Sequence, residues 1–164
     1  MSLSFRRADE ADAPVILELI RALAAEEQRP QAAIISLAGV KALISDPSFG
    51  AVVHVACGAR GDVVGYMMTA ALFSSFKGTK VLYLEDIVLA ASVRGQGHGR
   101  RLMGFLAGYA LAHGYASMQW SAQAENTGAV AFYAKMQAAH DASTLKYSAG
   151  AELLACWAAG APSV

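Results

Sequence analysis

Three closely spaced glycines occur in the run Arg94-Gly95-Gln96-Gly97-His98-Gly99, between an expected strand and an expected helix. Glycines let a backbone approach a phosphate closely, and the positive end of the following helix favours the anion. The G-x-G-x-G spacing differs from the dinucleotide fingerprint, and the run lacks the Gly-Lys-Ser/Thr ending of a nucleotide triphosphate loop. The residues alone leave two interpretations, a phosphate-binding loop or a glycine-rich turn without a ligand.

Two adjacent acids, Glu85 and Asp86, lie in the middle of the strand expected over residues 80–89. Regular alternation predicts that their side chains point to opposite faces, so that only one of them faces a cleft. A carboxylate inside a strand is unfavourable unless it meets water, a cation or a hydrogen-bond donor. The pair therefore indicates either a solvated or salt-bridged acid or a carboxylate that binds a substrate.

Other residues capable of chemistry carry weaker signals. Glu26 and Glu27 are typical of a solvated helix end, and Cys57 lies in an apolar strand, where it is expected in the core. His54 and His113 have no acid and nucleophile arranged near them in the sequence, so we expect structural roles for both.

Helical periodicity marks four segments. The first helix, capped by Asp9, has five apolar residues expected on one face: Val15, Ile16, Leu19, Ile20 and Leu23. A weaker helix begins near Ser36 and ends at Asp46-Pro47. The third covers residues 97–113, with Gly114 as its C-cap and one side formed by Leu102, Phe105, Leu106 and Tyr109. The fourth covers residues 127–136.

Strand patterns separate these helices. They cover residues 3–7, 50–58, 63–73, 80–89, 115–121, 145–147 and 152–157. The order β-α-α-β-β-β-α-β-α-β-β predicts an α/β fold, of α+β type, in which a central mixed sheet has helices on both faces. No linker or repeat interrupts the chain, so we expect a single domain over residues 1–164.

Composition excludes several classes of protein. Hydrophobic residues make up 55% and charged residues 16% of the 164 residues, which predicts a packed core. The net charge is zero, which argues against nucleic-acid binding. No apolar run reaches the roughly 18 residues of a membrane span, and residues 1–7 lack the apolar core of a signal peptide. With only Cys57 and Cys156, neither a disulfide nor a zinc site is expected, and a cytoplasmic location follows as the default.

Three ordered motifs resemble the GNAT acetyltransferases. Residues 93–99 are similar to the family's R/Q-x-x-G-x-G/A acetyl-CoA motif, and Asn126 with Ala129, Phe132 and Tyr133 resembles its later cofactor and catalytic helix. Tyr83-Leu84-Glu85-Asp86 resembles the strand of one subgroup, the diamine or spermidine/spermine acetyltransferases. The likeness covers most of the chain, beginning in the first helix, and is strongest over residues 83–133.

The resemblance implies a site for acetyl-CoA and no metal. Backbone groups of Ile87, Val88 and Leu89 are expected to hold the pantetheine arm as if it were a further strand, and Asn126 to contact the arm from the other side. The pyrophosphate is expected on the loop formed by Arg94, Gly95, Gln96, Gly97, His98, Gly99 and Arg100. His98 is expected to act through its backbone. Gln137 departs from the family, which usually has glycine shortly after its Phe-Tyr pair.

The same resemblance gives roles to three side chains. Tyr133, otherwise a packed helix residue, is expected to donate a proton to the departing thiolate, because its pKa of about 10 suits a thiol of pKa about 8.5. Glu85 is expected to bind the amine or to accept its proton through water. Glu27 is a candidate contact for a second amine. Direct attack in a ternary complex follows, with the strand amide near Val88 as oxyanion donor.

The acceptor remains open among several classes. A small amine, in particular a di- or polyamine, is the first expectation. A protein N-terminus, a lysine or an amino acid is an alternative acceptor, and a non-catalytic acyl-CoA-binding domain is an alternative of another class. We expect neither a nucleic-acid partner nor a membrane partner. A homodimer is expected from the family, and the apolar C-terminal strand is the local indication for it.

Overall fold

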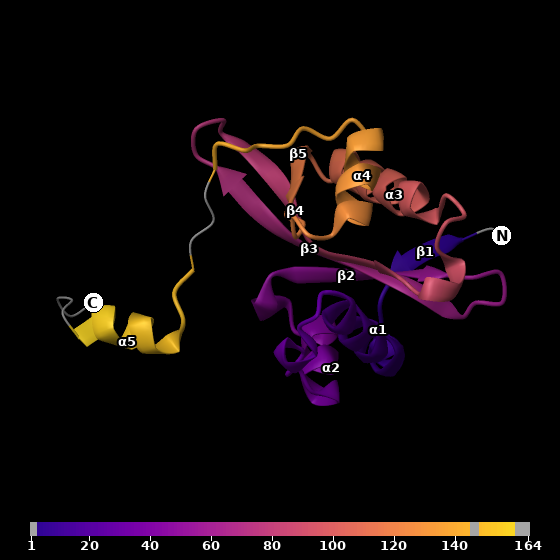
Figure 1. Cartoon of the computed structure of the whole chain (residues 1–164), viewed down its shortest axis with the longest axis horizontal. Coiled ribbons are helices and arrows are strands. Elements are labelled where there is room, and N and C mark those ends of the chain that lie inside the picture. Colours follow the sequence, from indigo (N-terminus) through magenta and orange to yellow (C-terminus); the bar gives the residue numbers. More distant parts are fainter. Residues whose placement is uncertain (1–2, 145–147, 160–164) are drawn as a thin grey trace. The chain divides into compact units, whose positions relative to one another are not determined.

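A five-stranded mixed sheet forms the centre of the fold (Figure 1). The computed structural model describes residues 3–144 and 148–159. The sheet has the order β1-β2-β3-β4-β5, in which the first four strands pair antiparallel and β4 pairs parallel with β5. The strands are β1 (Ser4–Arg7), β2 (Ala51–Cys57), β3 (Val63–Ser74), β4 (Thr79–Leu89) and β5 (Tyr115–Trp120).

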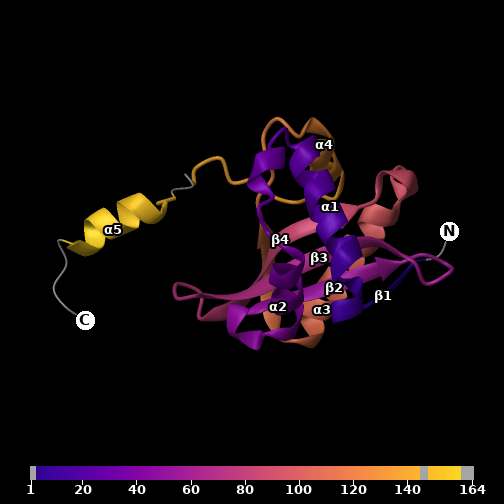
Figure 2. The ribbon, with the colours of Figure 1, turned by 90° about the horizontal axis from the view of Figure 1, so that it is seen from below.

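Helices cover both faces of this sheet, as the sequence predicts. Figure 2 shows α1 and α2 in front of the strands and α3 behind them. The bounds are α1 (Ala13–Glu26), α2 (Leu37–Ser45), α3 (His98–Ala112), α4 (Thr127–Lys135) and α5 (Ala151–Ala159). The predicted fold class is confirmed, and the four helices predicted up to residue 136 agree with α1 to α4 within about four residues at each end.

The chain divides into two compact units, Met1–Val130 and Ala131–Val164. The first unit contains the sheet, α1, α2 and α3. In the second unit, the strand predicted over residues 152–157 is wrong, because these residues belong to α5. Alanine, leucine and glutamate dominate that segment, and they favour a helix. The predicted strand at residues 145–147 lies outside the described residues, and the local indication of a dimer is lost with the second strand.

An acidic cap and an ion pair fix the short 3-10 turn, Glu10–Asp12, that leads into α1, so Asp9 caps this turn and not α1 itself. The Asp9 side chain accepts from the Ala11 N–H, and Asp12 accepts from the Asp9 N–H at 2.9 Å. Both carboxylate oxygens of Asp12 also accept from the Arg6 guanidinium, at 2.6 and 2.7 Å. Such a two-point contact is specific in direction. It ties the strand β1 to the residue directly before α1.

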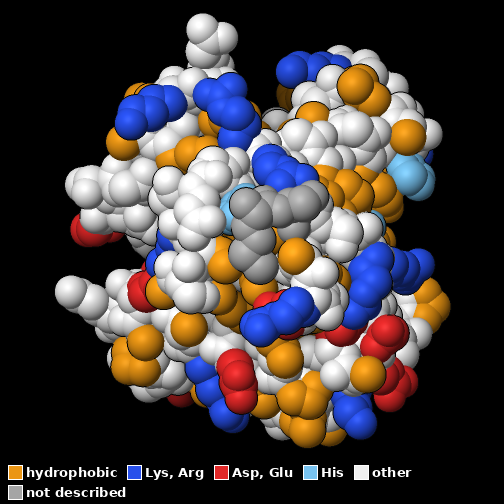
Figure 3. Space-filling view, turned by 90° about the vertical axis from the view of Figure 1, so that its right-hand side faces the viewer, with side chains coloured by type: hydrophobic (Ala, Val, Ile, Leu, Met, Phe, Trp, Pro, Cys, Tyr) orange, Lys and Arg blue, Asp and Glu red, His pale blue; other side chains and the backbone are white. Residues whose placement is uncertain are grey.

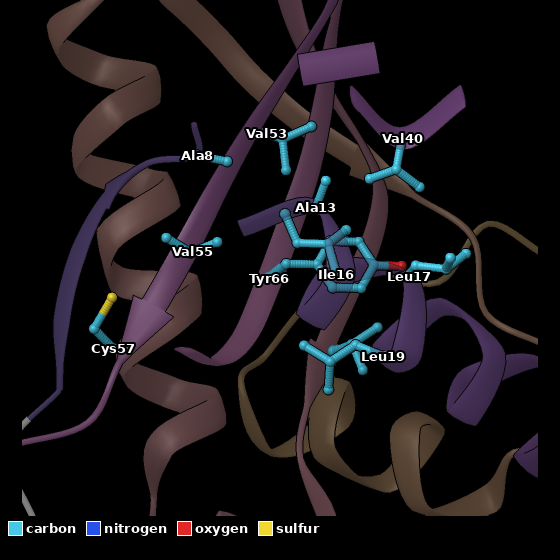
Figure 4. Packing of buried hydrophobic residues seen from close by; sticks show 11 residues of the cluster. Ala8, Ala13, Ile16, Leu17, Leu19, Val40, Val53, Val55, Cys57 and Tyr66 are labelled. Carbon is cyan, nitrogen blue, oxygen red and sulfur yellow. The ribbon is translucent and has the colours of Figure 1, made fainter. Parts of the chain in front are cut away.

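The main core lies between α1, α2 and the sheet (Figure 4). Ile16, Leu17 and Leu19 of α1 are buried there with Tyr66 of β3. Ile20 and Leu23 pack against this core, but the predicted position of Val15 on the buried face is wrong, because Val15 is 37% exposed and Leu17 takes its place. The buried stripe is therefore displaced slightly around the helix.

A second layer joins α3 to the opposite face. Leu102, Met103, Leu106 and Ala110 are buried, whereas the predicted Phe105 and Tyr109 form an aromatic cluster with Phe5 and His54 at centroid distances of 4.8–5.1 Å. Gly114, the predicted C-cap, has a φ of 72°, which glycine adopts without strain.

Replacing Asp12 with asparagine should lower the free energy of unfolding by about 1.5–3 kcal/mol at pH 7, the usual contribution of a hydrogen bond to a charged group. The hydrogen bond from Arg6, followed by that from the Asp9 N–H, holds the pKa of Asp12 below its ordinary value. A depressed pKa stabilises the fold above the unfolded-state pKa of about 3.9, and this contribution is lost as the pH falls through the folded value. Urea unfolding should therefore show the two proteins converging below pH about 4.

Asp9→Asn is the matched control for this measurement. Its carboxylate lies 3.6 Å from Arg6 and is largely exposed, so the variant should lose less than about 1 kcal/mol. Equal losses in the two variants, or a loss in Asp12→Asn that does not depend on pH, would contradict the assignment of the stabilising contact to Asp12.

Candidate active site

Strand β4 loses one of its neighbours halfway along its length. Its parallel pairing with β5 ends at Leu84 and Trp120, whereas its pairing with β3 continues to Leu89. Residues 85–89 therefore have one strand edge without a partner strand among the described residues. A strand edge of this kind has free N–H and C=O groups to which an extended molecule can bind.

Alternation decides which groups face that edge. The Ala90 N–H donates to the Val64 carbonyl on β3, and the groups of Val88 point to the same side by the two-residue period. The backbone groups of Ile87 and Leu89 therefore point away from β3, towards the open edge. Of the three residues predicted to hold a pantetheine arm, Ile87 and Leu89 have the suitable orientation.

A bulge interrupts β4 at the predicted acids. Met68 lies opposite Asp86 and Thr69 lies opposite Leu84, so Glu85 is an extra residue without a partner on β3. The prediction that Glu85 and Asp86 face opposite sides depended on regular alternation and is wrong. Both residues line one cavity of about 410 Å³ between α1, α2 and the sheet.

Asp86 is hydrogen-bonded inside this cavity. The Tyr66 hydroxyl donates to its Oδ2 at 2.9 Å. Burial raises the pKa of Asp86 above the ordinary value, and the negative charges of Glu85 and Glu27 raise it further, although the Tyr66 hydrogen bond opposes them. Burial likewise raises the pKa of the Tyr66 phenol. The hydrogen bond between Tyr66 and Asp86 was not predicted. The two residues are 20 positions apart in the sequence, and the bulge that sets their register leaves no mark in it.

Two further carboxylates act electrostatically on Asp86. Glu27 from the end of α1 and Glu85 from the bulge both influence Asp86 electrostatically. Within residues 3–144 and 148–159, none of the three has an ion-pair partner. Like charges this close favour a bound cation or a bound proton.

The glycine run forms a tight loop before α3. Gly95 and Gly97 have φ values of 74° and 78°, in the left-handed region that glycine adopts at least cost. Gly97 is the N-cap of α3 and supplies no side chain to its first amides. Gly99 lies within the first turn and has no positive φ. The loop therefore offers backbone N–H groups at a helix N-terminus, the arrangement that suits a pyrophosphate.

Arg94 holds this loop to two other elements. Its guanidinium contacts Glu26 of α1 through two N···O distances of 2.9 Å, and its Nε donates to the Leu89 carbonyl at 2.8 Å. The Arg94 side chain is thus engaged within the protein. Arg100, predicted in the same set, is exposed, whereas the His98 side chain is 3% exposed and its ring nitrogens have no partner in the described part of the chain.

Asn126 and Glu27 line a second hollow, of about 450 Å³. Glu26–Arg29 form one side of it, and the segment from Gln123 to Gly128 forms the other. The Asn126 Oδ1 accepts from the Ala129 N–H at 3.0 Å and so caps α4. Two residues predicted from separate motifs, Glu27 and Asn126, are therefore neighbours of one surface depression.

Tyr133 belongs to the second compact unit, in the last turns of α4. Its ring packs against Phe132 with centroids 5.2 Å apart, and burial raises the pKa of its phenol above the ordinary value. Gln137, where the family usually has glycine, has a φ of 60°, so it adopts the left-handed turn that a glycine would adopt.

The remaining candidates have structural surroundings. His54 is buried among aromatic rings, and burial lowers its pKa; Cys57 is in the core; the His113 Nδ1 lies 2.8 Å from the Tyr109 carbonyl. No group of three or more metal-ligating side chains occurs among the described residues.

None of the helices described is long and apolar enough to span a membrane. On the face in Figure 3, basic side chains are interspersed with acidic ones.

Comparison with known proteins agrees with this geometry. The acetyltransferase (GNAT) family matches residues 17–138. The chain is 32% identical over 137 residues to thialysine N-epsilon-acetyltransferase of Mus musculus, covering 76% of this chain and 80% of the relative.

Solved structures share the fold. An integron cassette protein from the mobile metagenome of V. cholerae superimposes with a TM-score of 0.78 at 24% identity, over 96% of this chain and 98% of its own. Ribosomal-protein-alanine N-acetyltransferase from Brucella melitensis gives 0.74 at 20% identity, over 91% and 100%. The family match spans well over half of the sequence, and the chain therefore belongs to the acetyltransferase (GNAT) family of N-acetyltransferases, which use acetyl-CoA as co-substrate.

Proposed function

We propose that this enzyme transfers the acetyl group of acetyl-CoA directly to a small amine, with a di- or polyamine as the first candidate. The observation that carries the proposal is that Glu85 and Asp86 lie at the start of the open edge of β4, with Glu27 acting electrostatically on Asp86, and that none of these three carboxylates has an ion-pair partner among the described residues. An amine is protonated at neutral pH and satisfies such a group. The mouse relative, named for the ε-nitrogen of thialysine, gives this acceptor class loose support.

The open edge and the glycine loop are suited to hold acetyl-CoA. Ile87 and Leu89 would bind the pantetheine arm through their backbone, with Val88 between them keeping the strand on β3. The amides of residues 95–100 would bind the pyrophosphate, and the side-chain amide of Asn126, whose Oδ1 caps α4, would donate to the arm. Acetyl-CoA then supplies the acetyl group as a thioester. The Ile87 N–H, rather than that of Val88, is oriented to stabilise an oxyanion.

Glu85 would bind the ammonium and accept its proton through water. Removing a proton from an amine of pKa about 10.4 at neutral pH costs roughly 4–5 kcal/mol, so a base must act before attack. Tyr133 would donate a proton to the departing thiolate. A phenol of ordinary pKa about 10 is protonated at neutral pH, as a donor requires, and burial raises the pKa of Tyr133 further.

The proposal includes a single acetyltransferase domain over residues 1–164. The family match continues from residue 17 to residue 138 and so crosses the boundary at Val130 between the two compact units. A homodimer is proposed from the family resemblance and a cytoplasmic location from the low cysteine content, and sedimentation equilibrium would measure the oligomeric state.

A thiol-release assay with acetyl-CoA tests the function. The panel should contain spermidine, putrescine, simple monoamines, lysine, thialysine and short peptides with free N-termini. Turnover on small amines with little on peptides is the expected result. Preference for the peptides would show that the acceptor is a protein N-terminus and not a small amine. Absence of turnover on every acceptor would contradict the catalytic proposal.

Gly97→Ala should weaken acetyl-CoA binding by about 5- to 30-fold. A residue with a Cβ costs about 1–2 kcal/mol in the left-handed conformation that Gly97 adopts, and the loop relieves that strain by moving its amides. Isothermal titration calorimetry gives the affinity. Gly104→Ala, in the same helix with open space around its added Cβ, is the control that should bind normally. Unchanged affinity in a folded Gly97→Ala protein would remove the loop from the cofactor site.

Tyr133→Phe should lower kcat by about 10²- to 10⁴-fold, the usual contribution of a general acid, with acetyl-CoA affinity changed less than about threefold. The substitution keeps the ring and deletes only the hydroxyl. Pre-steady-state thiol release measures the chemical step even if product release limits turnover. Tyr115→Phe, a matched loss of a hydroxyl on β5, should keep wild-type rates. A normal chemical step in Tyr133→Phe would leave the tyrosine a packing role only.

Glu27→Gln should raise the KM for spermidine roughly 10- to 150-fold, because a hydrogen bond to a charged group contributes about 1.5–3 kcal/mol. The KM for a monoamine should change little, since a monoamine has no second charge. Glu18→Gln, at an exposed position of the same helix, is the control. Equal losses on both substrates would indicate general damage to the site instead of recognition of a distal ammonium.

A further inference from the structure

The cavity behind the β4 bulge has apolar walls. Five of the aliphatic side chains and methionines that line it are only partly buried, although they pack against the main core: Ile20, Ile35, Leu43, Ile44 and Met68. Exposing apolar surface to water costs free energy, and covering that surface with an apolar group recovers it. The cavity volume of about 410 Å³ lies within the range of small-molecule sites.

The polar part of the cavity is confined to the sheet. Asp86, oriented by the Tyr66 hydroxyl at 2.9 Å, and Glu85 of the bulge are the acids that line it. Neither has an ion-pair partner within the described ranges. A ligand that fits both parts has a cationic head for the carboxylates and an uncharged apolar body for α1 and α2.

We propose that this cavity binds the apolar substituent of the acceptor, so that primary amines carrying an alkyl or aryl group of several carbons are acceptors of this enzyme. This inference rests on the proposed function, because it takes the acids at the bulge as the site of the reacting amine. The far end of the acceptor can then take one of two positions. A distal ammonium lies towards Glu27 and the polar hollow, whereas an apolar chain lies in the cavity.

A distal ammonium is unsuited to the cavity itself. Moving a charge into apolar surroundings is costly unless it is paired, and the cavity walls away from Glu85 and Asp86 offer aliphatic side chains. A chain of methylene groups has no such cost. The two acceptor types are therefore separated by the chemistry of their far ends.

The first test is a homologous series from methylamine to n-hexylamine in the thiol-release assay. Each methylene that enters the cavity should raise kcat/KM about three- to fivefold, the usual gain for a buried CH₂, until the cavity is filled. Calorimetric titration of n-hexylamine into the protein with coenzyme A present should show the same trend in Kd. A flat series in both measurements would overturn the proposal.

The second test fills the cavity from its rim. Ala32 lines the cavity and is exposed, so Ala32→Phe adds a ring there without disturbing the core. It should weaken n-hexylamine binding and lower its kcat/KM by at least tenfold, and it should affect methylamine much less. Ala38→Phe, exposed on α2 outside the cavity lining, should leave both amines as in the wild type.

The outcomes separate this inference from the proposed function. Binding of n-hexylamine that Ala32→Phe abolishes, without acetyl transfer to any amine, would support the cavity and overturn the acetyl-transfer step. Acetylation of short amines and polyamines without any gain from longer alkyl chains would support the proposed function and overturn the cavity. Equal binding of n-hexylamine by wild type and Ala32→Phe would also overturn it.

Discussion

The separation of β4 from β5 beyond Leu84 is the constraint on which the rest of the site depends. A strand that keeps one partner and loses the other has backbone groups that a folded protein normally pairs. Here β3 stays paired with β4 up to Leu89, so the open edge is held on one side. The Leu89 carbonyl at its end accepts from Arg94, and a short helical turn, Ala91–Val93, leads from there to the glycine loop.

The bulge at Glu85 accounts for the electrostatics of the site. An extra residue in β4 brings Glu85 and Asp86 to one cavity, where burial and the negative charges of Glu85 and Glu27 raise the pKa of Asp86. The Tyr66 hydroxyl compensates only Asp86, and only in part. Neither acid has an ion-pair partner among the described residues, and the proposed amine site rests on this feature.

The sequence predicted the parts of the site that depend on local chemistry. The turn after β4 and the helix that follows it were confirmed, because glycines and an apolar helical period leave marks in the local sequence. The left-handed φ of Gly95 and Gly97 fits such a turn. The strands and helices up to α4 follow from periodicity for the same reason. The prediction was wrong for residues 152–157, where a short apolar segment fits either period and helix propensity decides.

The parts that sequence reasoning missed depend on register and tertiary contacts. The period of β4 continues through Glu85 and Asp86 without any glycine or proline to mark the bulge, so alternation assigned them to opposite faces. Asp86 and Tyr66, which form a hydrogen bond, are 20 positions apart in the sequence. Arg94 and Glu26 are 68 positions apart.

The Arg94–Glu26 contact shows how the motif arginine acts in this chain. The resemblance predicts it at the cofactor, yet its guanidinium spans from the loop to the end of α1 and also binds the Leu89 carbonyl, one of the groups that face the open edge. Glu27 is the next residue after Glu26, so the same ion pair that orients the loop also fixes the end of the helix that carries Glu27. One side chain thus joins the loop of the predicted cofactor region to the end of α1, next to the predicted amine contact, through a hydrogen bond and an ion-pair contact of 2.9 Å each.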